Sequence, residues 1–386
     1  MNKKVLVVLI VALVAIVLLI ASIAILITNL KNNSVLRLKD ANIKHDEKFG
    51  GIYVDISIED FNALGFEFGD SVNIKLSNGY ELYDLPYYNG YYVDMGEALL
   101  VGYPKYEYIK IGINYGDDVW LLANCKEDDT ITITLNEKGK YKDIQESSDI
   151  HYVEEQGELS DVVFTNFRNV KVGGLKDNTL YRSASPIDNT HNRAAVTDKL
   201  AKAAEINYDV DLSDSDGKIT EHIDKADFNS PYFLSLLRDN KVVALDMSMN
   251  FKAEDFKEGL VKGLTEMSKN EGPYLVHCVE GKDRTGFVCM ILEGLCGASY
   301  DEIIDDYMLT YDNYYGITKE TELTKYEIIK ARNIDAMLKY ITGVEDTENL
   351  KNVDYSKTIF NYLLAIGMKS DDILNLKSNL TYTIYN

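Results

Sequence analysis

Residues 276–297 read VHCVEGKDRTGFVCMILEGLCG, and this stretch decides the fold of the chain's larger part. Leu275 and Val276 close a short apolar run typical of a buried strand, and Thr285 opens an apolar run typical of a buried helix. Cys278 and Arg284 stand in the loop between these two segments, six positions apart. We therefore expect the loop at the carboxyl end of a strand, where open α/β sheets bind their ligands.

The residues of this loop suit the binding and transfer of a phosphoryl group. Backbone N–H groups of a strand–helix loop and the positive end of the helix form an anion site, and Gly281 permits the tight turn. In that field the thiol of Cys278 is expected to ionise and attack phosphorus. Arg284 offers a planar fork for two phosphate oxygens, and His277 and Thr285 flank the loop where they can orient it.

The motif HCVEGKDRTG resembles the signature of bacterial atypical tyrosine and lipid phosphatases, whose loops read HC-x-x-GKDRTG. TNFRNVKVGGLKDNTLYRSASPI (165–187) resembles the opening segment of that family, and YDVDLSDSD (208–216) stands where the family has Asp-Leu-Arg. The resemblance covers roughly residues 160–320. It implies a phosphatase-like α/β domain, catalytic Cys278, Arg284 and Asp283, and a phosphate-binding loop. The loop residues are His277, Val279, Glu280, Gly281, Lys282 and Thr285.

One position departs from that family, and the general acid has more than one candidate. Ser213 replaces the arginine of Asp-Leu-Arg, and Arg182 and Arg193 are candidates to supply its role, with ordinary structural arginines as the alternative. A leaving alcohol needs a proton. We favour Asp283 as its donor, because it lies within the loop. Asp214 or Asp216 on a mobile loop is the alternative.

Further residues near the motif bear on the choice of substrate. Lys282 would add positive charge and widen the tolerance towards phosphoinositides or inositol polyphosphates; the alternative is a solvent-facing lysine. Tyr307, Tyr311 and Tyr314 lie in DDYMLTYDNYYG, which resembles a helix of the same family. They either line the pocket or pack in the core.

Composition excludes some classes of partner. The net charge of −22 over 386 residues argues against nucleic acid, because phosphate backbones would be repelled. Four cysteines without a CxxC pair, and only five histidines, argue against a disulfide framework and a zinc site. We expect Cys125, Cys289 and Cys296 to be buried, and the expected chemistry needs no metal and no organic cofactor.

The N-terminus predicts a membrane anchor. Lys3 and Lys4 precede Val5–Thr28, a run without charge that is long enough to span a bilayer as a helix. We interpret residues 1–30 as an uncleaved transmembrane anchor. The two lysines favour a cytoplasmic N-terminus and a body outside the cytoplasm, at the cell surface. Lys31, Arg37 and Lys39 weaken that bias, so a cytoplasmic body is the alternative.

The rest of the chain divides into three segments. Residues 31–48 are polar and predict a linker. Residues 49–143 alternate with period two between turn residues, which predicts a small β-barrel or sandwich. Residues 144–386 mix helices and strands and predict an α/β domain with a mainly parallel sheet, tyrosine-phosphatase-like, with a helical C-terminal part.

The expected β-barrel carries a second resemblance. FGDSVNIKL (68–76) and GEALLVGYPKYEYIKIGINYGD (96–117) resemble the C-terminal β-barrel of SAM hydroxide adenosyltransferases, over residues 60–118. That resemblance implies a fold. The many tyrosines of this segment indicate either a stacking surface for a ring-bearing ligand or ordinary strand packing.

Three functions follow from these patterns. The first is a cysteine-dependent phosphatase acting on phosphorylated proteins, as a tyrosine or dual-specificity enzyme, or on small phosphomonoesters such as inositol phosphates and phosphoinositides. The second is a surface-anchored binding protein with an inactive phosphatase-like domain. The third is a sulfur-transfer or arsenate-reducing thiol enzyme, which requires a second working cysteine near Cys278.

Overall fold

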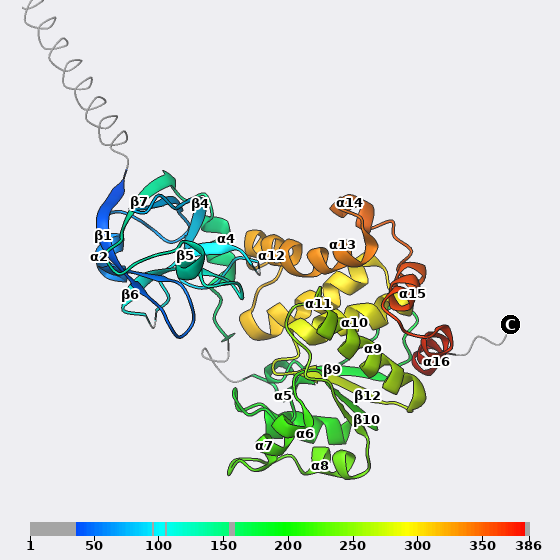
Figure 1. The fold of residues 1–386 in the computed structure, drawn as a ribbon. Helices are drawn as coiled ribbons and strands as arrows, with labels where there is room; N and C mark the ends of the chain where they lie inside the picture. The colour runs from blue at the N-terminus through cyan, green and yellow to red at the C-terminus, as the bar shows by residue number, and fades with distance from the viewer. Residues whose placement is uncertain (1–35, 95, 105, 154–158, 383–386) are drawn as a thin grey trace, which may run out of the picture. The chain divides into compact units, whose positions relative to one another are not determined.

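Each of two units of the chain has a large hydrophobic core of its own. The computed structural model describes residues 36–94, 96–104, 106–153 and 159–382. The chain separates into two compact units, Met1–Asp149 and Ile150–Asn386 (Figure 1).

The first unit is a closed β-barrel with the strand order β1-β2-β6-β5-β4-β3-β7. The strands are β1 Arg37–His45, β2 Ile52–Ser57, β3 Ser71–Leu76, β4 Glu81–Tyr88, β5 Ala98–Val101, β6 Tyr108–Ile113 and β7 Thr130–Glu137. Neighbours are antiparallel, except that β4 and β5 are parallel. In the described part of this unit there are also three short helices, α2 Ile58–Ala63, α3 Val119–Leu122 and α4 Lys142–Ser148.

Alternation along the strands explains the barrel core. In β3, Val72 and Ile74 are buried and Lys75 beyond them is exposed, as period two requires. Ile131 and Ile133 of β7 are buried in the same core. The structure therefore confirms the predicted β-barrel.

The prediction of a linker over residues 31–48 is wrong for its described part. Residues Arg37–His45 form β1, which pairs with β2 on one side and with β7 on the other and so closes the barrel. The strand was missed because most of its side chains are polar and face outward, and Ile43 is its one fully buried residue. At the other end, the barrel unit includes α4 as far as Ser148, beyond the predicted limit at residue 143.

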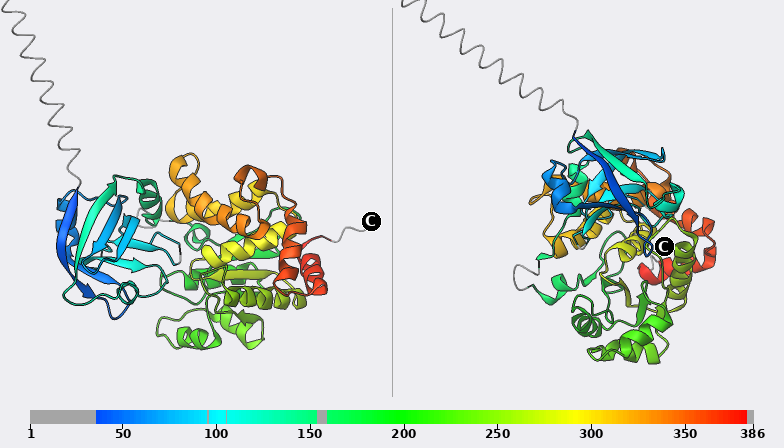
Figure 2. Two further views of the ribbon diagram at one scale, coloured as in Figure 1. Left: turned by 45° about the horizontal axis from the view of Figure 1, so that its top comes forward. Right: turned by 60° about the vertical axis from the view of Figure 1, so that its left-hand side comes forward.

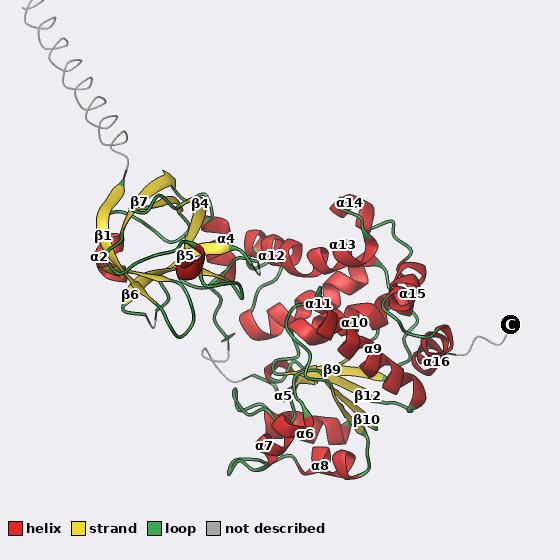
Figure 3. Cartoon of the chain, in the orientation of Figure 1, coloured by secondary structure: helices red, strands yellow, loops and turns green. Residues whose placement is uncertain are grey.

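The second unit holds a five-stranded sheet with the order β11-β10-β12-β9-β8. The strands are β8 Arg168–Asn169, β9 Leu180–Ala184, β10 Tyr208–Asp211, β11 Val242–Ala244 and β12 Tyr274–Cys278. All pairs are parallel except β8 with β9, so the sheet is mainly parallel, as predicted. Figure 3 shows this sheet enclosed by helices.

Helices cover both faces of the sheet (Figure 2). On one face lie α9 Glu254–Lys269, α10 Asp283–Leu295 and α16 Ser370–Leu380, and on the other α6 Ala194–Ala203 and α8 Pro231–Arg238. The remaining elements are α5 Asp161–Phe164, α7 Asp216–Ile223, α11 Tyr300–Tyr315, α12 Leu323–Lys330, a π-helical turn Ala331–Asp335, α13 Ala336–Thr342, α14 Thr347–Leu350 and α15 Tyr355–Ala365. The C-terminal part is therefore helical, as predicted.

The central strand β12 packs against helices on both of its sides. Val276 and Cys278 belong to the large core shared with α9 and α10, whereas Leu275 belongs to a smaller core shared with α6 and α8. Side chains on a strand alternate between faces, so a strand buried on both sides is apolar throughout. This double burial explains the apolar run that precedes the loop.

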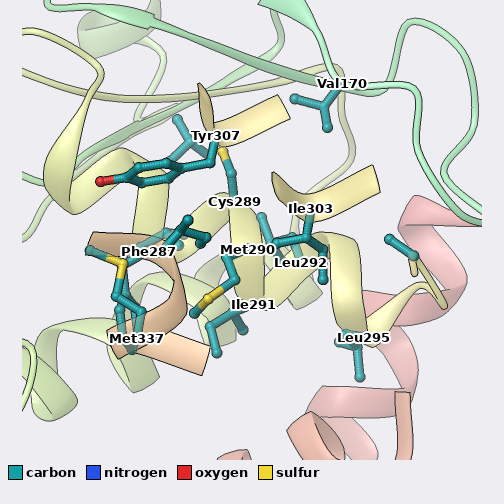
Figure 4. Close-up of a cluster of buried hydrophobic side chains, with 14 of the residues drawn as sticks. Val170, Phe287, Cys289, Met290, Ile291, Leu292, Leu295, Ile303, Tyr307 and Met337 are labelled. Carbon is teal, nitrogen blue, oxygen red and sulfur yellow. The ribbon is translucent and has the colours of Figure 1, made fainter. Parts of the chain in front are cut away.

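Helix α10 is buried on all sides. Figure 4 shows Phe287, Cys289, Met290, Ile291 and Leu292 within a cluster of apolar side chains from several helices. The helix begins at Asp283, two residues before the predicted start at Thr285. The same cluster holds Tyr307 of α11 and Met337 of α13. A helix that is apolar on every face needs such enclosure to be stable in water.

The predicted membrane anchor, residues 1–30, lies outside the described residues. Over the described ranges, every helix is too short or too polar to cross a bilayer. The anchor and the sidedness of the body therefore stay predictions.

Candidate active site

The loop between β12 and α10 is held in one conformation by a close backbone approach. Gly281 has φ +65°, in the left-handed region. A Cβ at this position would lie 2.1 Å from the carbonyl oxygen of Ser183 in β9. Only glycine accommodates both constraints without strain. The turn that the sequence predicted at Gly281 is thus set by the strand beside the loop.

A pocket of about 230 Å³ opens at this loop. Its lining residues are Tyr152, His191, Met249, Cys278, Val279, Glu280, Asp283 and Arg284. The structure therefore brings five of the predicted site residues to one cavity, Cys278, Val279, Glu280, Asp283 and Arg284. Tyr152, His191 and Met249 are additions from other parts of the second unit.

The thiol of Cys278 lies in an environment that favours its ionised form. The side chain is buried, with 4% of its surface exposed. Burial opposes ionisation, but the positive charge of Arg284 and hydrogen bonding from Thr285 outweigh it, so the pKa of Cys278 lies below its ordinary value. Of the four thiols, Cys278 is the one whose pKa is lowered.

The other three cysteines lack such an environment. Cys289 and Cys296 are buried, and burial raises the pKa of each to about 12. Cys125, in the barrel, is half-buried rather than fully buried as predicted, and burial raises its pKa to about 11. A sulfur-transfer enzyme would need a second reactive thiol beside Cys278, and the described cysteines provide none.

Arg284 reaches from the loop to the segment that follows β11. Its Nη1 donates a hydrogen bond to the carbonyl oxygen of Met247 at 3.1 Å. Its Nε is buried and has no hydrogen-bond partner among the described residues. The guanidinium is thus fixed at one end and retains an unpaired N–H donor, and the Arg284 side chain contributes to the pocket lining. An arginine with an unpaired N–H group is suited to donate a hydrogen bond to a bound oxyanion.

His277 lies behind the loop rather than in the pocket. Its Nε2 is 2.9 Å from Oδ1 of Asp209 in β10, and both side chains are fully buried. Although burial opposes protonation, Asp209 and Asp211 raise the pKa of His277 to about 9. The two acidic neighbours thus favour the charged form of His277, which is next to Cys278 in the chain. The described contacts tie its ring to β10 and not to the thiol.

A buried ionic cluster supports the loop from beneath. Arg182 of β9 donates from Nη1 to Asp306 at 2.7 Å and from Nη2 to the carbonyl oxygen of Gly281 at 2.9 Å. Asn166 donates to the same carbonyl oxygen at 3.1 Å, and Arg168 binds Asp306 at 2.8 Å. Burial works against the charge of Asp306, yet both arginines hold its pKa well below the usual range.

This cluster gives Asn166, Arg168, Arg182 and Asp306 a structural role. All four lie in segments that resemble the phosphatase family, but the sequence suggested a function for Arg182 alone. The described contacts of Arg182 go to Asp306 and to the loop backbone, so it positions the loop from behind. The signal that could have found the cluster is the placement of two buried arginines on neighbouring strands, which requires a buried acid.

Glu280 stands at the centre of a polar cluster on the pocket wall. The hydroxyl of Tyr152 donates a hydrogen bond to its carboxylate. The nitrogen atoms of His191, Arg193 and Lys282 lie 3.8, 3.9 and 3.4 Å from its carboxylate oxygens. Opposite charges at such separations largely cancel one another's field at a distance. Glu280 therefore lowers the positive potential on its side of the pocket.

Lys282 and Arg193 both contact aromatic rings near Glu280. Lys282 Nζ donates to the hydroxyl of Tyr315 at 3.2 Å. The guanidinium of Arg193 lies 4.4 Å from the ring centroid of Tyr314. Arg193 is 1% exposed and does not line the pocket, so these contacts favour a structural arginine. The alternative of a solvent-facing Lys282 is wrong, because only 16% of its side chain is exposed.

The three candidate general acids lie in different places. Asp283 lines the pocket, with 38% of its side chain exposed. Asp214 is buried 3.7 Å from His222, and burial together with Asp211 raises its pKa to about 6. Asp216 is exposed in the first turn of α7. Neither Asp214 nor Asp216 lines the pocket.

The tyrosines of α11 pack mainly in the core. Tyr307, Tyr311 and Tyr314 are all buried. Tyr314 also donates its hydroxyl hydrogen to the carbonyl oxygen of Glu280 at 2.7 Å, which fixes the loop backbone. None of the three lines the pocket described above. Core packing is therefore the correct interpretation, with a loop-supporting role for Tyr314.

Within the described ranges, no group of three or more His, Cys, Asp or Glu side chains is arranged to hold a metal ion. The site thus consists of a thiol with a lowered pKa, an arginine donor and a carboxyl group around one cavity. These parts lie at a strand–loop–helix junction of an α/β sheet, a place where backbone N–H groups and a helix N-terminus can bind an anion.

Comparison with known proteins agrees with this arrangement. The family model described as "Tyrosine phosphatase family" matches residues 164–382. The chain belongs to the tyrosine phosphatase family, and that membership indicates phosphatase activity on phosphoesters.

Other comparisons add little. No curated protein matches the chain. A solved structure, described as an uncharacterized conserved protein from Thermotoga maritima, is 24% identical over 24% of this chain, with a TM-score of 0.22. The match spans 35% of that protein's length.

Proposed function

We propose that this chain hydrolyses phosphomonoesters through a cysteinyl-phosphate intermediate formed on Cys278. The observation that carries the proposal is the placement of the Cys278 thiol, Arg284 and Asp283 at one pocket, where Arg284 and Thr285 lower the pKa of the thiol against the effect of burial. A thiolate is a strong nucleophile, and a guanidinium stabilises the charge on a transferring phosphoryl group.

The proposed reaction has two steps. In the first, the sulfur of Cys278 forms a bond to phosphorus while the bond to the leaving oxygen breaks, and Asp283 gives that oxygen a proton. In the second, water attacks phosphorus, the sulfur–phosphorus bond breaks, and Asp283 takes the proton from the water. Inorganic phosphate leaves and the thiolate is restored. Arg284 binds two phosphoryl oxygens throughout both steps.

The direct test is hydrolysis of para-nitrophenyl phosphate by the purified full chain. We expect turnover that excess EDTA leaves unchanged, because the proposed steps use only protein side chains. No turnover under conditions where the chain is folded would contradict the proposal. That outcome would favour the alternative, a binding protein with an inactive phosphatase-like domain.

The role of Asp283 leads to a prediction about leaving groups. Asp283→Asn should lower kcat for an alkyl phosphate by about 10²- to 10⁴-fold, the usual contribution of general acid catalysis. The effect on para-nitrophenyl phosphate should be smaller, since nitrophenolate leaves readily without a proton. Steady-state kinetics with both substrates checks this.

Asp216→Asn is the matched control, because Asp216 is exposed and does not line the pocket. We expect it to behave as the unaltered chain does. Selective slowing of the alkyl phosphate in Asp214→Asn or Asp216→Asn, with Asp283→Asn unaffected, would assign the acid to the other loop.

The charge around Glu280 favours phosphotyrosine over polyphosphorylated substrates. Glu280 neutralises Lys282, the loop residue that would otherwise attract a second phosphate. The ring of Tyr152 on the pocket wall suits a flat aryl group. We therefore propose phosphotyrosine, on a protein or peptide, as the substrate class, ahead of inositol phosphates and phosphoinositides.

Replacing Glu280 by glutamine should widen the substrate range. In Glu280→Gln, kcat/KM for an inositol bisphosphate should rise about tenfold relative to a phosphotyrosine peptide, because a negative charge near the second phosphate is lost. Glu254→Gln, on the exposed surface of α9, is the matched control. An unchanged ratio would show that Glu280 does not select the substrate.

A further inference from the structure

A second pocket, of about 350 Å³, lies on the barrel unit. Its floor is the outer face of β6, where Lys110 and Gly112 are two residues apart and so point to the same side. Ile109 and Ile111, on the other side of the strand, fill the barrel core. The pocket is separate from the cysteine loop, which belongs to the other unit.

Lys110 is unusual for a residue on the outside of a barrel. An outward-facing lysine ordinarily extends into water. Lys110 is instead 1% exposed, and Gly51 makes room for its stem, since a Cβ there would lie 2.6 Å from Lys110 Cε. Its Nζ donates to Asp46 at 2.5 Å and lies 5.5 and 5.8 Å from the ring centroids of Tyr53 and Tyr106.

Stability alone does not account for this buried pair. Enclosing an ammonium and a carboxylate costs desolvation energy that their attraction often fails to recover. An ammonium also carries three N–H donors, and the hydrogen bond that the described residues provide goes to Asp46. Lys110 therefore keeps donor capacity at the floor of a pocket that it lines.

Aromatic rings form the walls and the rim of the same pocket. Tyr91 and Tyr106 stand on its walls with their hydroxyl oxygens 3.5 Å apart. Burial raises the pKa of Tyr91 above its ordinary value, so its hydroxyl stays a neutral donor. Phe49 and Tyr115 are at the rim, 69% and 82% exposed. Large apolar rings gathered at an opening are typical of a binding site.

The backbone at Tyr115 carries strain that places its ring at this rim. Tyr115 has φ +46°, in the left-handed region that bulky residues rarely adopt. Such a strained conformation is concentrated at functional sites. Glycine would relieve the strain but would remove the ring from the pocket. The strained turn and the exposed ring therefore point to a ligand.

We propose that this pocket binds a flat, uncharged ring compound that carries a carbonyl or ring-nitrogen acceptor. The rings of Phe49, Tyr106 and Tyr115 would contact its faces, and Lys110 Nζ would donate to the acceptor. A cationic amine lacks the acceptor to which Lys110 Nζ would donate. An anionic ligand would meet Asp46, which already balances the lysine, and Asp117 at the lining.

A series of probes with one shared scaffold tests this assignment. Binding of benzamide, benzoate, benzylamine and cyclohexanecarboxamide to the full chain is measured by saturation-transfer NMR. We expect saturable binding of benzamide, and about tenfold weaker binding or none for the other three. Benzoate and benzylamine are charged, and cyclohexanecarboxamide has no flat ring. Equal binding of all four, or preferred binding of benzoate, would overturn the proposal.

Substitutions at the exposed rim of the pocket test the binding without disturbing the barrel core, because the rim side chains are largely exposed. Tyr115→Ser and Phe49→Ser should each weaken benzamide binding about tenfold, the usual effect of losing one stacking ring. Tyr83→Ser is the matched control, because Tyr83 is 66% exposed on the same barrel but does not line this pocket. Equal losses in the control and the rim variants would contradict the assignment.

Two further measurements distinguish the barrel pocket from the cysteine loop and from a sugar site. Cys278→Ser and added inorganic phosphate should leave benzamide binding unchanged, because both act on the second unit; a loss of binding in either case would contradict a separate site. Saturable binding of N-acetylglucosamine that requires Tyr115, without binding of benzamide, would assign the pocket to a sugar and overturn the proposed ligand class.

Discussion

Replacing Cys278 by serine is expected to lower kcat for para-nitrophenyl phosphate on the order of 10⁴-fold or more, as removal of an enzyme's nucleophile does. The serine hydroxyl is slightly smaller than the thiol and does not ionise near neutral pH. Arg284 and Thr285 would still surround the position, so phosphate binding should persist while turnover fails. Steady-state kinetics measure the loss of turnover. Binding of inorganic phosphate to the Cys278→Ser protein measures whether phosphate binding persists.

Cys289→Ser is the control for a general effect of losing a thiol. Cys289 is buried in α10, so this change tests packing and should leave the chemistry intact in the folded fraction. Activity that survives in Cys278→Ser would contradict the proposed covalent mechanism, whatever the effect of the control.

Replacing Asp306 by asparagine is expected to destabilise the second unit by about 3–5 kcal/mol, the usual cost of breaking a buried charge pair. Asparagine has nearly the same shape but removes the carboxylate that pairs with both Arg168 and Arg182. Since Arg182 also supports the carbonyl oxygen of Gly281, activity of the folded fraction should fall as well. Urea unfolding followed by circular dichroism measures the stability change.

The neighbouring Asp305 provides a matched control on the same helix. Its side chain is 69% exposed, and Asp305→Asn should change the stability by less than about 1 kcal/mol. The folded-state pKa of Asp306 is depressed, so its contribution is present above the ordinary carboxyl pKa of 3.8 and is lost as pH falls below it. The difference between the unaltered chain and Asp306→Asn should therefore shrink in acid.

Much of the loop could be predicted from the sequence because its constraints are local. The strand ending at Cys278, the turn at Gly281 and the helix after it follow from apolar runs and one glycine. The grouping of Cys278, Asp283 and Arg284 at one pocket follows from their short separation. The barrel strands were equally visible, since period-two alternation shows wherever one face is buried.

The supporting contacts were harder to predict because they join distant parts of the chain. Arg182 meets Asp306 across 124 positions, and Tyr152 meets Glu280 across 128. Nothing local to Tyr152 indicates that it reaches the pocket. Strand β1 was missed for a related reason. Its mostly polar sequence does not indicate a strand, and its backbone pairs with β2 and β7, of which β7 is distant in the chain. Lys110 has the sequence pattern of an ordinary outward lysine, and its burial depends on loops that are distant in the chain.

The measurement that tests the central claim most directly is capture of the phosphorylated enzyme. The full chain is mixed with a phosphotyrosine peptide, quenched in acid within one turnover, digested and sequenced by mass spectrometry. We predict phosphate on the sulfur of Cys278, and none in Cys278→Ser. Turnover without any phosphorylated enzyme, or with phosphate on another residue, would contradict the account.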